Sequence, residues 1–229
     1  MPPSEYYPEA LADQSLRVVT SVLAVVPDAI VIGGWGTWKR FGLLKSHDID
    51  LIVEPAGRAA IRPLCSDWSE STHVGGRTWR GRVEGVHIDL YVPFQSRLGQ
   101  RLQLRIEKLL PYTETLGMWR VLTRPAHAVT KMAALLDRPD SLPGEKDRHE
   151  LRALLTGAVT PADLVPILRS AAGGAPNTLG ALAAEAIGYL QDLGLERAER
   201  ARLRVWEGTL RRSFDPHADP PPRIRRRRD

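Results

Sequence analysis

Apolar residues recur with two different periods in the first half of the chain. A run of helix formers from Glu9 to Val26 precedes the apolar stretch Ala29–Ile32, which predicts a buried strand. Alternation with a period of two predicts a strand over Asp48–Val53 and a hairpin of strands Arg77–Glu84 and Val86–Val92. The other elements expected in this half are a helix over 58–68, a helix over 95–109 and a strand over 118–122.

The second half has only helical patterns after Pro125. Thr160 is a suitable N-cap for the third of its helices. The expected helices cover 126–136, 146–155, 161–171, 178–193 and 196–212. The sequence therefore predicts an α+β fold, a mixed sheet flanked by helices and followed by a helical C-terminal region. The expected division is a catalytic domain over 1–124, a helical domain over 125–212 and a disordered basic tail over 213–229.

The composition is that of a globular protein. The chain has 229 residues, of which 43% are hydrophobic and 26% charged, which suffices for a catalytic module and a smaller helical one. The one cysteine, Cys65, excludes a disulfide framework and favours a reducing compartment. The apolar run Val18–Val26 ends at Pro27 before reaching membrane-spanning length, so a cytoplasmic protein without a membrane partner is expected.

Two acidic residues share one face of the expected strand over 48–53. Because strand side chains repeat with period two, Asp48 and Asp50 point the same way, about 6.5 to 7 Å apart at Cα. Such carboxylates repel each other unless a cation lies between them, and Mg²⁺ takes oxygen ligands and bridges substrate phosphates. The alternative is an exposed edge strand with two solvated aspartates.

A glycine pair and a third aspartate favour the metal interpretation. Gly33 and Gly34 directly follow the first strand, where the backbone can approach a phosphate closely. Asp89 lies on the polar face of the strand over 86–92, between His87 and Tyr91. If that strand pairs beside the other two, three carboxylates converge, as two-metal catalysis requires, and Asp89 is both a ligand and the candidate base. Phosphoryl or nucleotidyl transfer is the chemistry this pattern predicts.

The stretches Val31–Trp35 and Lys45–Leu51, with Asp89, resemble the DNA polymerase beta-like nucleotidyltransferase superfamily. They look most like its small bacterial and archaeal branches, the abortive-infection type IV toxin nucleotidyltransferases and the aminoglycoside or lincosamide nucleotidyltransferases. The resemblance implies a two-metal Mg²⁺ site, with Mn²⁺ as a substitute, held by three catalytic aspartates. It also implies that a nucleoside triphosphate binds near the glycine turn. The implied residues are Asp48, Asp50 and Asp89 for the metals, and Gly33, Gly34 and Ser46 for the nucleotide.

Two later residues are assigned by the toxin branch alone. There a helical lysine contacts the triphosphate and a downstream acidic residue closes the site, which implies Lys131 and Asp147. The toxin pattern has an arginine one turn after the lysine, where this chain has Leu135, and its next arginine is Arg138. The alternatives are that Lys131 is a solvated helix lysine and that Asp147 caps the following helix or complements its charge.

Three interpretations of the function remain open, and two of them differ in the acceptor. RNA, most plausibly tRNA, with a cognate antitoxin as a further partner, follows from the toxin branch and is consistent with the arginine-rich end, including Arg225–Arg228. Glutamates such as Glu199 could equally pair with the arginines of the expected helix over 196–212, as in an ordinary solvated charged face. A cationic small molecule of the aminoglycoside or lincosamide type is the rival acceptor. The third interpretation is a non-catalytic nucleotide-binding or antitoxin-like protein.

Overall fold

The fold is an α+β arrangement in which one mixed sheet is flanked by helices and followed by further helices, as the sequence predicts. The computed structural model describes residues 7–73, 76–157 and 159–215. The strands of the main sheet are β1 (Ile30–Val31), β2 (Ile49–Ile52), β3 (Ser66–His73), β4 (Gly76–Val83), β5 (Val86–Tyr91), β8 (Thr113–Leu116) and β9 (Trp119–Leu122). The α-helices are α1 (Glu9–Val25), α2 (Gly33–Phe41), α3 (Pro55–Ile61), α4 (Arg124–Asp137), α5 (Leu142–Leu155), α6 (Pro161–Ala171), α7 (Pro176–Gly188) and α8 (Arg197–Phe214).

The strand order places the expected catalytic strands side by side. The seven strands run β3-β4-β5-β2-β1-β9-β8. β2 pairs with β5 in parallel and with β1 in antiparallel orientation, whereas β4 and β5 form the expected hairpin. In the parallel pair, Asp50 lies opposite Asp89, so the period-two pattern of both strands brings the two carboxylates to one face.

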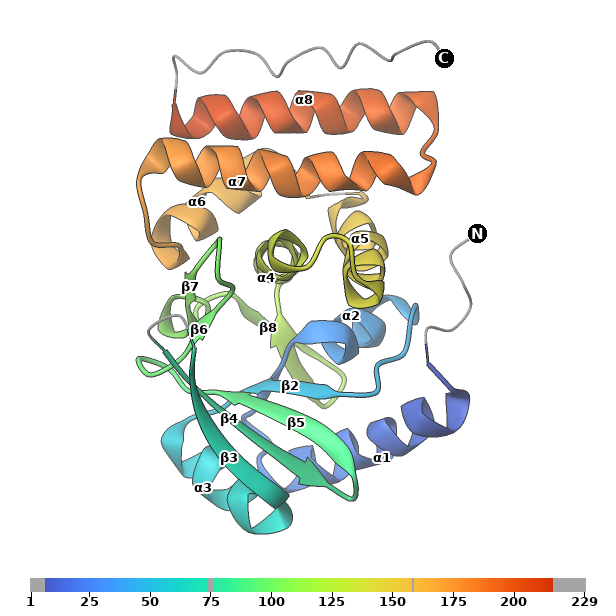
Figure 1. Ribbon diagram of the computed structural model, residues 1–229, viewed down its shortest axis with the longest axis vertical. Coiled ribbons are helices and arrows are strands. Elements are labelled where there is room, and N and C mark those ends of the chain that lie inside the picture. The colour runs from blue at the N-terminus through green and yellow to red at the C-terminus, as the bar shows by residue number, and fades with distance from the viewer. Residues whose placement is uncertain (1–6, 74–75, 158, 216–229) are drawn as a thin grey trace.

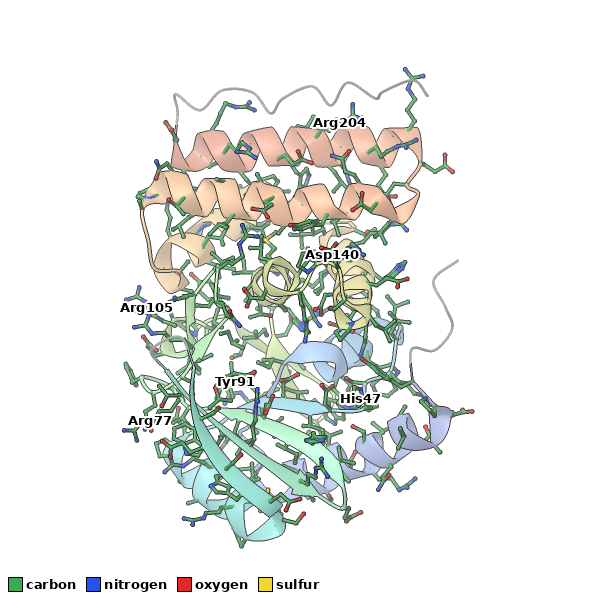
Figure 2. The ribbon with its side chains drawn as sticks, viewed as in Figure 1. His47, Arg77, Tyr91, Arg105, Asp140 and Arg204 are labelled. Carbon is green, nitrogen blue, oxygen red and sulfur yellow. The ribbon has the colours of Figure 1, made fainter. Side chains whose placement is uncertain are left out.

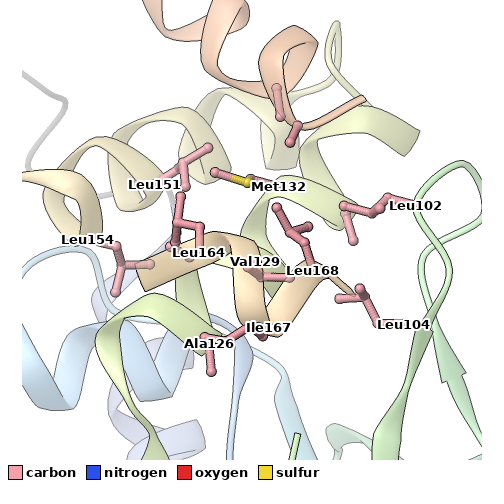
Figure 3. Packing of buried hydrophobic residues seen from close by; sticks show 14 of the residues in the cluster. Leu102, Leu104, Ala126, Val129, Met132, Leu151, Leu154, Leu164, Ile167 and Leu168 are labelled. Carbon is pink, nitrogen blue, oxygen red and sulfur yellow. The ribbon is translucent and has the colours of Figure 1, made fainter. Parts of the chain in front are cut away.

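Helices cover the two faces of the sheet differently (Figure 1). α1 and α3 lie against one face, where Ile49, Leu51, Ile88 and Leu90 form a buried cluster with Val22 and its neighbours. On the other side, α4 and α5 lie between the sheet and the outer pair α7 and α8 (Figure 1). Leucines from α5 and α6 pack around Val129 and Met132 of α4 (Figure 3), and this second cluster also includes Ile30 and Leu122 of the sheet. The main hydrophobic core therefore includes residues from both sides of position 124/125. The division into two domains at that position stays a prediction.

The helix predicted over 58–68 is only partly present. α3 ends at Ile61, a 3₁₀ turn η1 (Arg62–Leu64) follows, and the chain then enters the edge strand β3. Pro63 cannot continue an α-helix, and Asp67 has a positive φ of 51° at an irregularity in the pairing with β4. The strand escaped prediction because both of its faces are largely polar, as is common at a sheet edge.

The helix predicted over 95–109 is wrong. This segment forms the small sheet of β6 (Arg97–Leu98) and β7 (Leu104–Arg105), followed by the 3₁₀ turn η2 (Ile106–Lys108). Its leucines fit a helical period by spacing, but Gly99 has a φ of +77°, outside the helical region. Leu102, Leu104 and Ile106 are instead buried at alternate positions.

The helical half agrees with the prediction apart from its ends. Within the described residues no strand of the main sheet follows β9, and Thr160 is the N-cap of α6, with its N–H donating to Asp163. The expected helix over 178–193 divides into α7 and the 3₁₀ turn η3 (Tyr189–Leu193). Ser213 and Phe214 belong to α8 rather than to the expected tail, Asp215 is the C-cap of that helix, and 216–229 lie outside the described residues. No described helix is long and apolar enough to cross a membrane.

Candidate active site

A polar cavity of about 700 Å³ lies where the sheet meets α2, α4 and α5. This volume is within the usual range for small-molecule sites. All eight residues predicted from the sequence line it: Gly33, Gly34, Ser46, Asp48, Asp50, Asp89, Lys131 and Asp147. The structure therefore brings together residues from the two halves of the chain, although their roles remain predictions.

The glycine pair forms the beginning of α2 rather than an open turn. Gly33 has a φ of +61°, and a Cβ built on it would lie 2.2 Å from Oδ2 of Asp50. The N-cap residue, Ile32, supplies no side-chain hydrogen bond, so the first amides of α2 have no cap from it at the cavity. Uncapped amides and the positive end of the helix dipole favour an anion such as phosphate. Gly33 therefore packs closely against Asp50, whereas the expected approach of its backbone to a phosphate stays a prediction.

The three carboxylates line the cavity with different partners. Asp48 accepts a hydrogen bond from Oγ of Ser46 at 2.8 Å, and Asp89 accepts one from Nε of Arg80 at 2.9 Å. Asp50 lies between them, against Gly33 and beside Asp89 in the sheet. Within the described residues, His, Cys, Asp and Glu side chains do not form a group of three already arranged to hold a metal ion. Asp48 and Asp89 are instead oriented by the hydrogen bonds that they accept from Ser46 and Arg80.

The charges of these carboxylates are strongly coupled. Burial, together with the charges of Asp48 and Asp89, raises the pKa of Asp50 to about 8. Burial also raises the pKa of Asp89, although Arg80 opposes this. The pKa of Asp48 is lowered because the hydrogen bond from Ser46 and nearby cations outweigh burial. Three oxygen-donor side chains that line one cavity suit a hard divalent cation, so these residues fit the expected metal.

Lys131 and Asp147 meet in a buried network of charges between α4 and α5. Nζ of Lys131 donates to Asp147 at 2.8 Å and also pairs with Glu150, which is fully buried. Burial alone would lower the pKa of Lys131, but these two carboxylates outweigh it and raise that pKa. Arg138 binds the other oxygen of Asp147 at 2.8 Å, with its own side chain 48% exposed at the cavity. Lys131 is therefore not a solvated helix lysine, and Asp147 does not cap a helix.

Lys146 is a cavity residue that the sequence analysis did not assign. Its Nζ lies 3.3 Å from Oγ of Ser46 and 3.8 Å from Glu150, and it would be 2.8 Å from a Cβ built on Gly34. Burial lowers its pKa, although Glu150 opposes this. Its position four residues before Glu150 was the available signal, because side chains at i and i+4 lie on the same surface of a helix.

His127, for which the sequence predicts no chemical role, contacts the backbone of the glycine pair. Its Nε2 lies 3.0 Å from the carbonyl oxygen of Gly33, to which it donates in the Nε2–H tautomer. Burial and the charge of Lys131 lower the pKa of His127 to about 3, so its ring is neutral. Trp35 is also buried and donates to Ser15, as expected for a packing residue.

Comparison with known proteins yields structural similarity at low sequence identity. Neither a family model nor a curated protein sequence matches the chain. The crystal structure of JHP933 from Helicobacter pylori is similar with a TM-score of 0.44 and 12% identity, covering 90% of this chain and 94% of that chain. An antigenic nucleotidyltransferase-like protein from Paracoccidioides brasiliensis is similar with a TM-score of 0.39 and 15% identity, covering 84% and 91%.

Proposed function

We propose that the protein is a Mg²⁺-dependent nucleotidyltransferase of the cytoplasm. It transfers a nucleoside monophosphate from a nucleoside triphosphate to an acceptor oxygen. The acceptor oxygen forms a bond to the α-phosphorus, the bond to the β-phosphate oxygen breaks, and pyrophosphate and the acceptor proton are released. The observation that carries the proposal is the contact between Gly33 at the start of α2 and Asp50 on β2, with Asp48 and Asp89 on the same cavity.

The triphosphate has a complementary surface on the helical side of the cavity. Gly33 and Gly34 at the start of α2 line the cavity, as do Lys146 and Arg138 from other elements. Lys146 lies beside Ser46, so one cation and one hydroxyl are available next to the glycine backbone. Positively charged and N–H donors at fixed positions stabilise the charge that develops on transferring phosphoryl groups.

The aspartates would hold the metal ions and handle the acceptor proton. Asp48, Asp50 and Asp89 would be the ligands, and Mg²⁺ held there would supply positive charge next to the triphosphate and the pyrophosphate leaving group. Asp89 is also the candidate base, because its carboxylate lines the cavity in which the acceptor would bind.

The proposed acceptor is RNA, and tRNA in particular. The arginine-rich helix α8 lies at the end of the molecule away from the sheet (Figure 1), so its basic residues do not contribute to the cavity itself. Support comes instead from Arg80 and Arg97, which line the cavity on its strand side. Cations at that position disfavour the rival small-molecule acceptor, since aminoglycosides carry several positive charges.

Incubation of the purified protein with each α-labelled nucleoside triphosphate, Mg²⁺ and total cellular RNA tests the proposal. We expect label in RNA from the wild type and none from Asp48→Asn or Asp50→Asn. Asp192→Asn, an exposed substitution in η3, is the matched control and should retain transfer. Transfer that persists in Asp50→Asn would contradict the assignment, and label on neither RNA nor a small molecule would favour the non-catalytic interpretation.

A further inference from the structure

We propose that the strand side of the cavity binds a phosphate of the acceptor, through Arg80 and Arg97. This inference rests on the proposed function and specifies how the acceptor is recognised at the same site. We call this surface the strand flank, and it consists of Ser71, Thr72, Thr78, Arg80, Arg97 and Gln100. The partner is a single-stranded RNA end, recognised by a phosphate next to the reacting hydroxyl.

The two flanks lie on opposite sides of the carboxylates. The nucleotide flank, made of Gly34, Ser46, Lys131, Arg138 and Lys146, comes from α2, the loop before β2, α4, α5 and the connection between them. The strand flank comes from β3, β4, β6 and the residues after β6. β5 and β2 separate β4 from β1 in the sheet, and they carry Asp89 and Asp50. The arginines of the strand flank are therefore separated by the carboxylates from the amides and cations that suit the triphosphate.

Arg80 has the exposure and the weak pairing expected of a ligand-binding residue. Its side chain is 60% exposed, and Asp89 is the partner of its guanidinium among the described residues. Because the guanidinium is largely exposed and Asp89 is partly exposed, the ion pair contributes little to stability and its opening costs little. If Asp89 binds a metal ion instead, the guanidinium becomes available to a phosphate, which it can bind through two N–H groups.

Arg97 supplies a second cation from a separate element. Its backbone is held against the start of β4, where a Cβ built on Gly76 would lie 2.7 Å from N of Arg97. Arg77 N–H donates to the carbonyl of Gln95 at 2.7 Å, which ties the same segment to β4. In the part of the chain that the structure describes, the guanidinium of Arg97 has no hydrogen bond or ion pair, yet it lines the cavity. An unpaired cation on a fixed backbone is suited to an anionic ligand.

The hydroxyl groups between the two arginines also suit RNA. Ser71 and Thr78 lie opposite each other in the β3–β4 pairing, and both line the cavity. Hydroxyls can donate to phosphate oxygens and can donate to or accept from a ribose 2′-OH. Two arginines and this hydroxyl pair form a surface for a sugar–phosphate chain, whereas a polycationic acceptor would be repelled.

Fluorescence anisotropy with a labelled single-stranded RNA oligonucleotide, without triphosphate, tests the strand flank. We expect Arg80→Gln and Arg97→Gln each to weaken binding about tenfold, since each removes one charge-assisted contact. Each should also reduce the slope of log affinity against log salt by about 0.7. Arg204→Gln, on α8 at the far end of the molecule from Tyr91 in the cavity (Figure 2), is the matched control and should change neither quantity.

The pairing of Arg80 with Asp89 gives an independent arm of the test. Asp89→Asn frees Arg80 and should tighten oligonucleotide binding by more than Asp48→Asn, which removes a charge from the same cavity but not the partner of Arg80. In an Arg80→Gln background this extra gain should vanish, because a double-mutant cycle isolates the pair. An equal gain with and without Arg80 would contradict the exchange of partners.

Several results would overturn the inference while leaving the proposed function intact. The first is that the Arg80→Gln, Arg97→Gln double variant binds the oligonucleotide as tightly as the wild type, and the second is that Arg204→Gln weakens binding equally. The third is that the wild type binds no oligonucleotide, and the fourth is that kanamycin binds in the cavity and displaces the oligonucleotide. In each case Mg²⁺ with a nucleoside triphosphate should still raise the thermal stability of the double variant. If Mg²⁺ with a nucleoside triphosphate does not stabilise the wild type either, the proposed function itself is contradicted.

Discussion

The two sides of the cavity carry similar charges but hold them in opposite ways. On the nucleotide flank, Lys131 and Lys146 are each 7% exposed and face Glu150, which is fully buried. On the strand flank, Arg80 is 60% exposed with one exposed ion pair, and Arg97 has no partner among the described residues. One side is a fixed network, and the other consists of cations that can change partner.

This difference matches what each substrate would need. A triphosphate and its metal ions demand fixed positions, because catalysis by electrostatic stabilisation depends on groups that do not reorganise during the reaction. An acceptor that must enter and leave is served by weakly paired side chains, whose release costs little. The contrast leads to four predictions, in order of decreasing effect.

Removal of the buried acid should have the largest effect. Glu150→Gln leaves Lys131 and Lys146 close together with one negative partner fewer, and loss of one member of a buried charge pair costs about 3–5 kcal/mol. We expect the lower end of this range because Asp147 still pairs with Lys131. Chemical denaturation measures the change. The control Glu185→Gln, which breaks the exposed pair with Arg101, should cost less than about 1 kcal/mol.

Gly33→Ala should impair transfer more than stability. A Cβ there would overlap Oδ2 of Asp50, so the carboxylate must move, and a displacement of about 1 Å in an active site can cost about 100-fold in rate. Gly42→Ala is the matched control, because Gly42 at the other end of α2 has a φ of +63° and nothing within 4 Å of the added Cβ. Equal losses of activity in both variants would show that backbone strain, rather than displacement of Asp50, causes the loss.

His127 should make the fixed side of the cavity sensitive to acid. Its pKa is lowered to about 3 by burial and by Lys131, whereas an unfolded histidine titrates near 6.5. Since the unfolded state binds the proton more tightly, this residue removes stability as the pH falls below about 6.5, by up to about 1.4 kcal/mol per pH unit. Denaturation curves of His127→Gln and the wild type should therefore converge on acidification. Parallel curves would show that His127 does not titrate in this way.

Arg80→Gln should have the smallest effect on stability. The pair with Asp89 is exposed, so we expect a change below about 1 kcal/mol in denaturation experiments, with the fold intact. A loss comparable to that of Glu150→Gln would mean that the strand flank is as fixed as the nucleotide flank, and the contrast between them would fail.

The strands that carry Asp50 and Asp89 could be predicted because their signal is local. The period-two alternation around Asp50 and Asp89 depends only on neighbouring residues, and it correctly places both carboxylates on the polar face. The hairpin around Gly85 follows from the same pattern, and Gly85 has the positive φ of a turn. Pairing of β2 with β5 was the condition on which convergence of the carboxylates depended, and it is present.

The remaining features depend on contacts distant in the sequence. The leucines of 95–109 fit a helical period as well as the alternation that buries Leu102 and Leu104 against helices from the other half of the chain. Likewise, Lys146 and Ser46 are separated by 100 residues, and the support of Gly33 by His127 spans 94. The resemblance already implied Lys131 and Asp147, but the contacts that bring Lys146 and His127 to the glycine pair became visible only in the structure.

Thermal denaturation with Mg²⁺, with a nucleoside triphosphate and with both tests the central claim most directly, which is that the aspartates and α2 together bind a metal–triphosphate complex. We predict that the wild type needs both ligands for its full stabilisation, about 2.7 kcal/mol at 100 times the dissociation constant. Asp50→Asn should fold, since burial and the neighbouring carboxylates raise the pKa of Asp50 and so disfavour its charged form, but it should lose this stabilisation, whereas Asp192→Asn should keep it. Equal stabilisation of Asp50→Asn and the wild type would contradict the account.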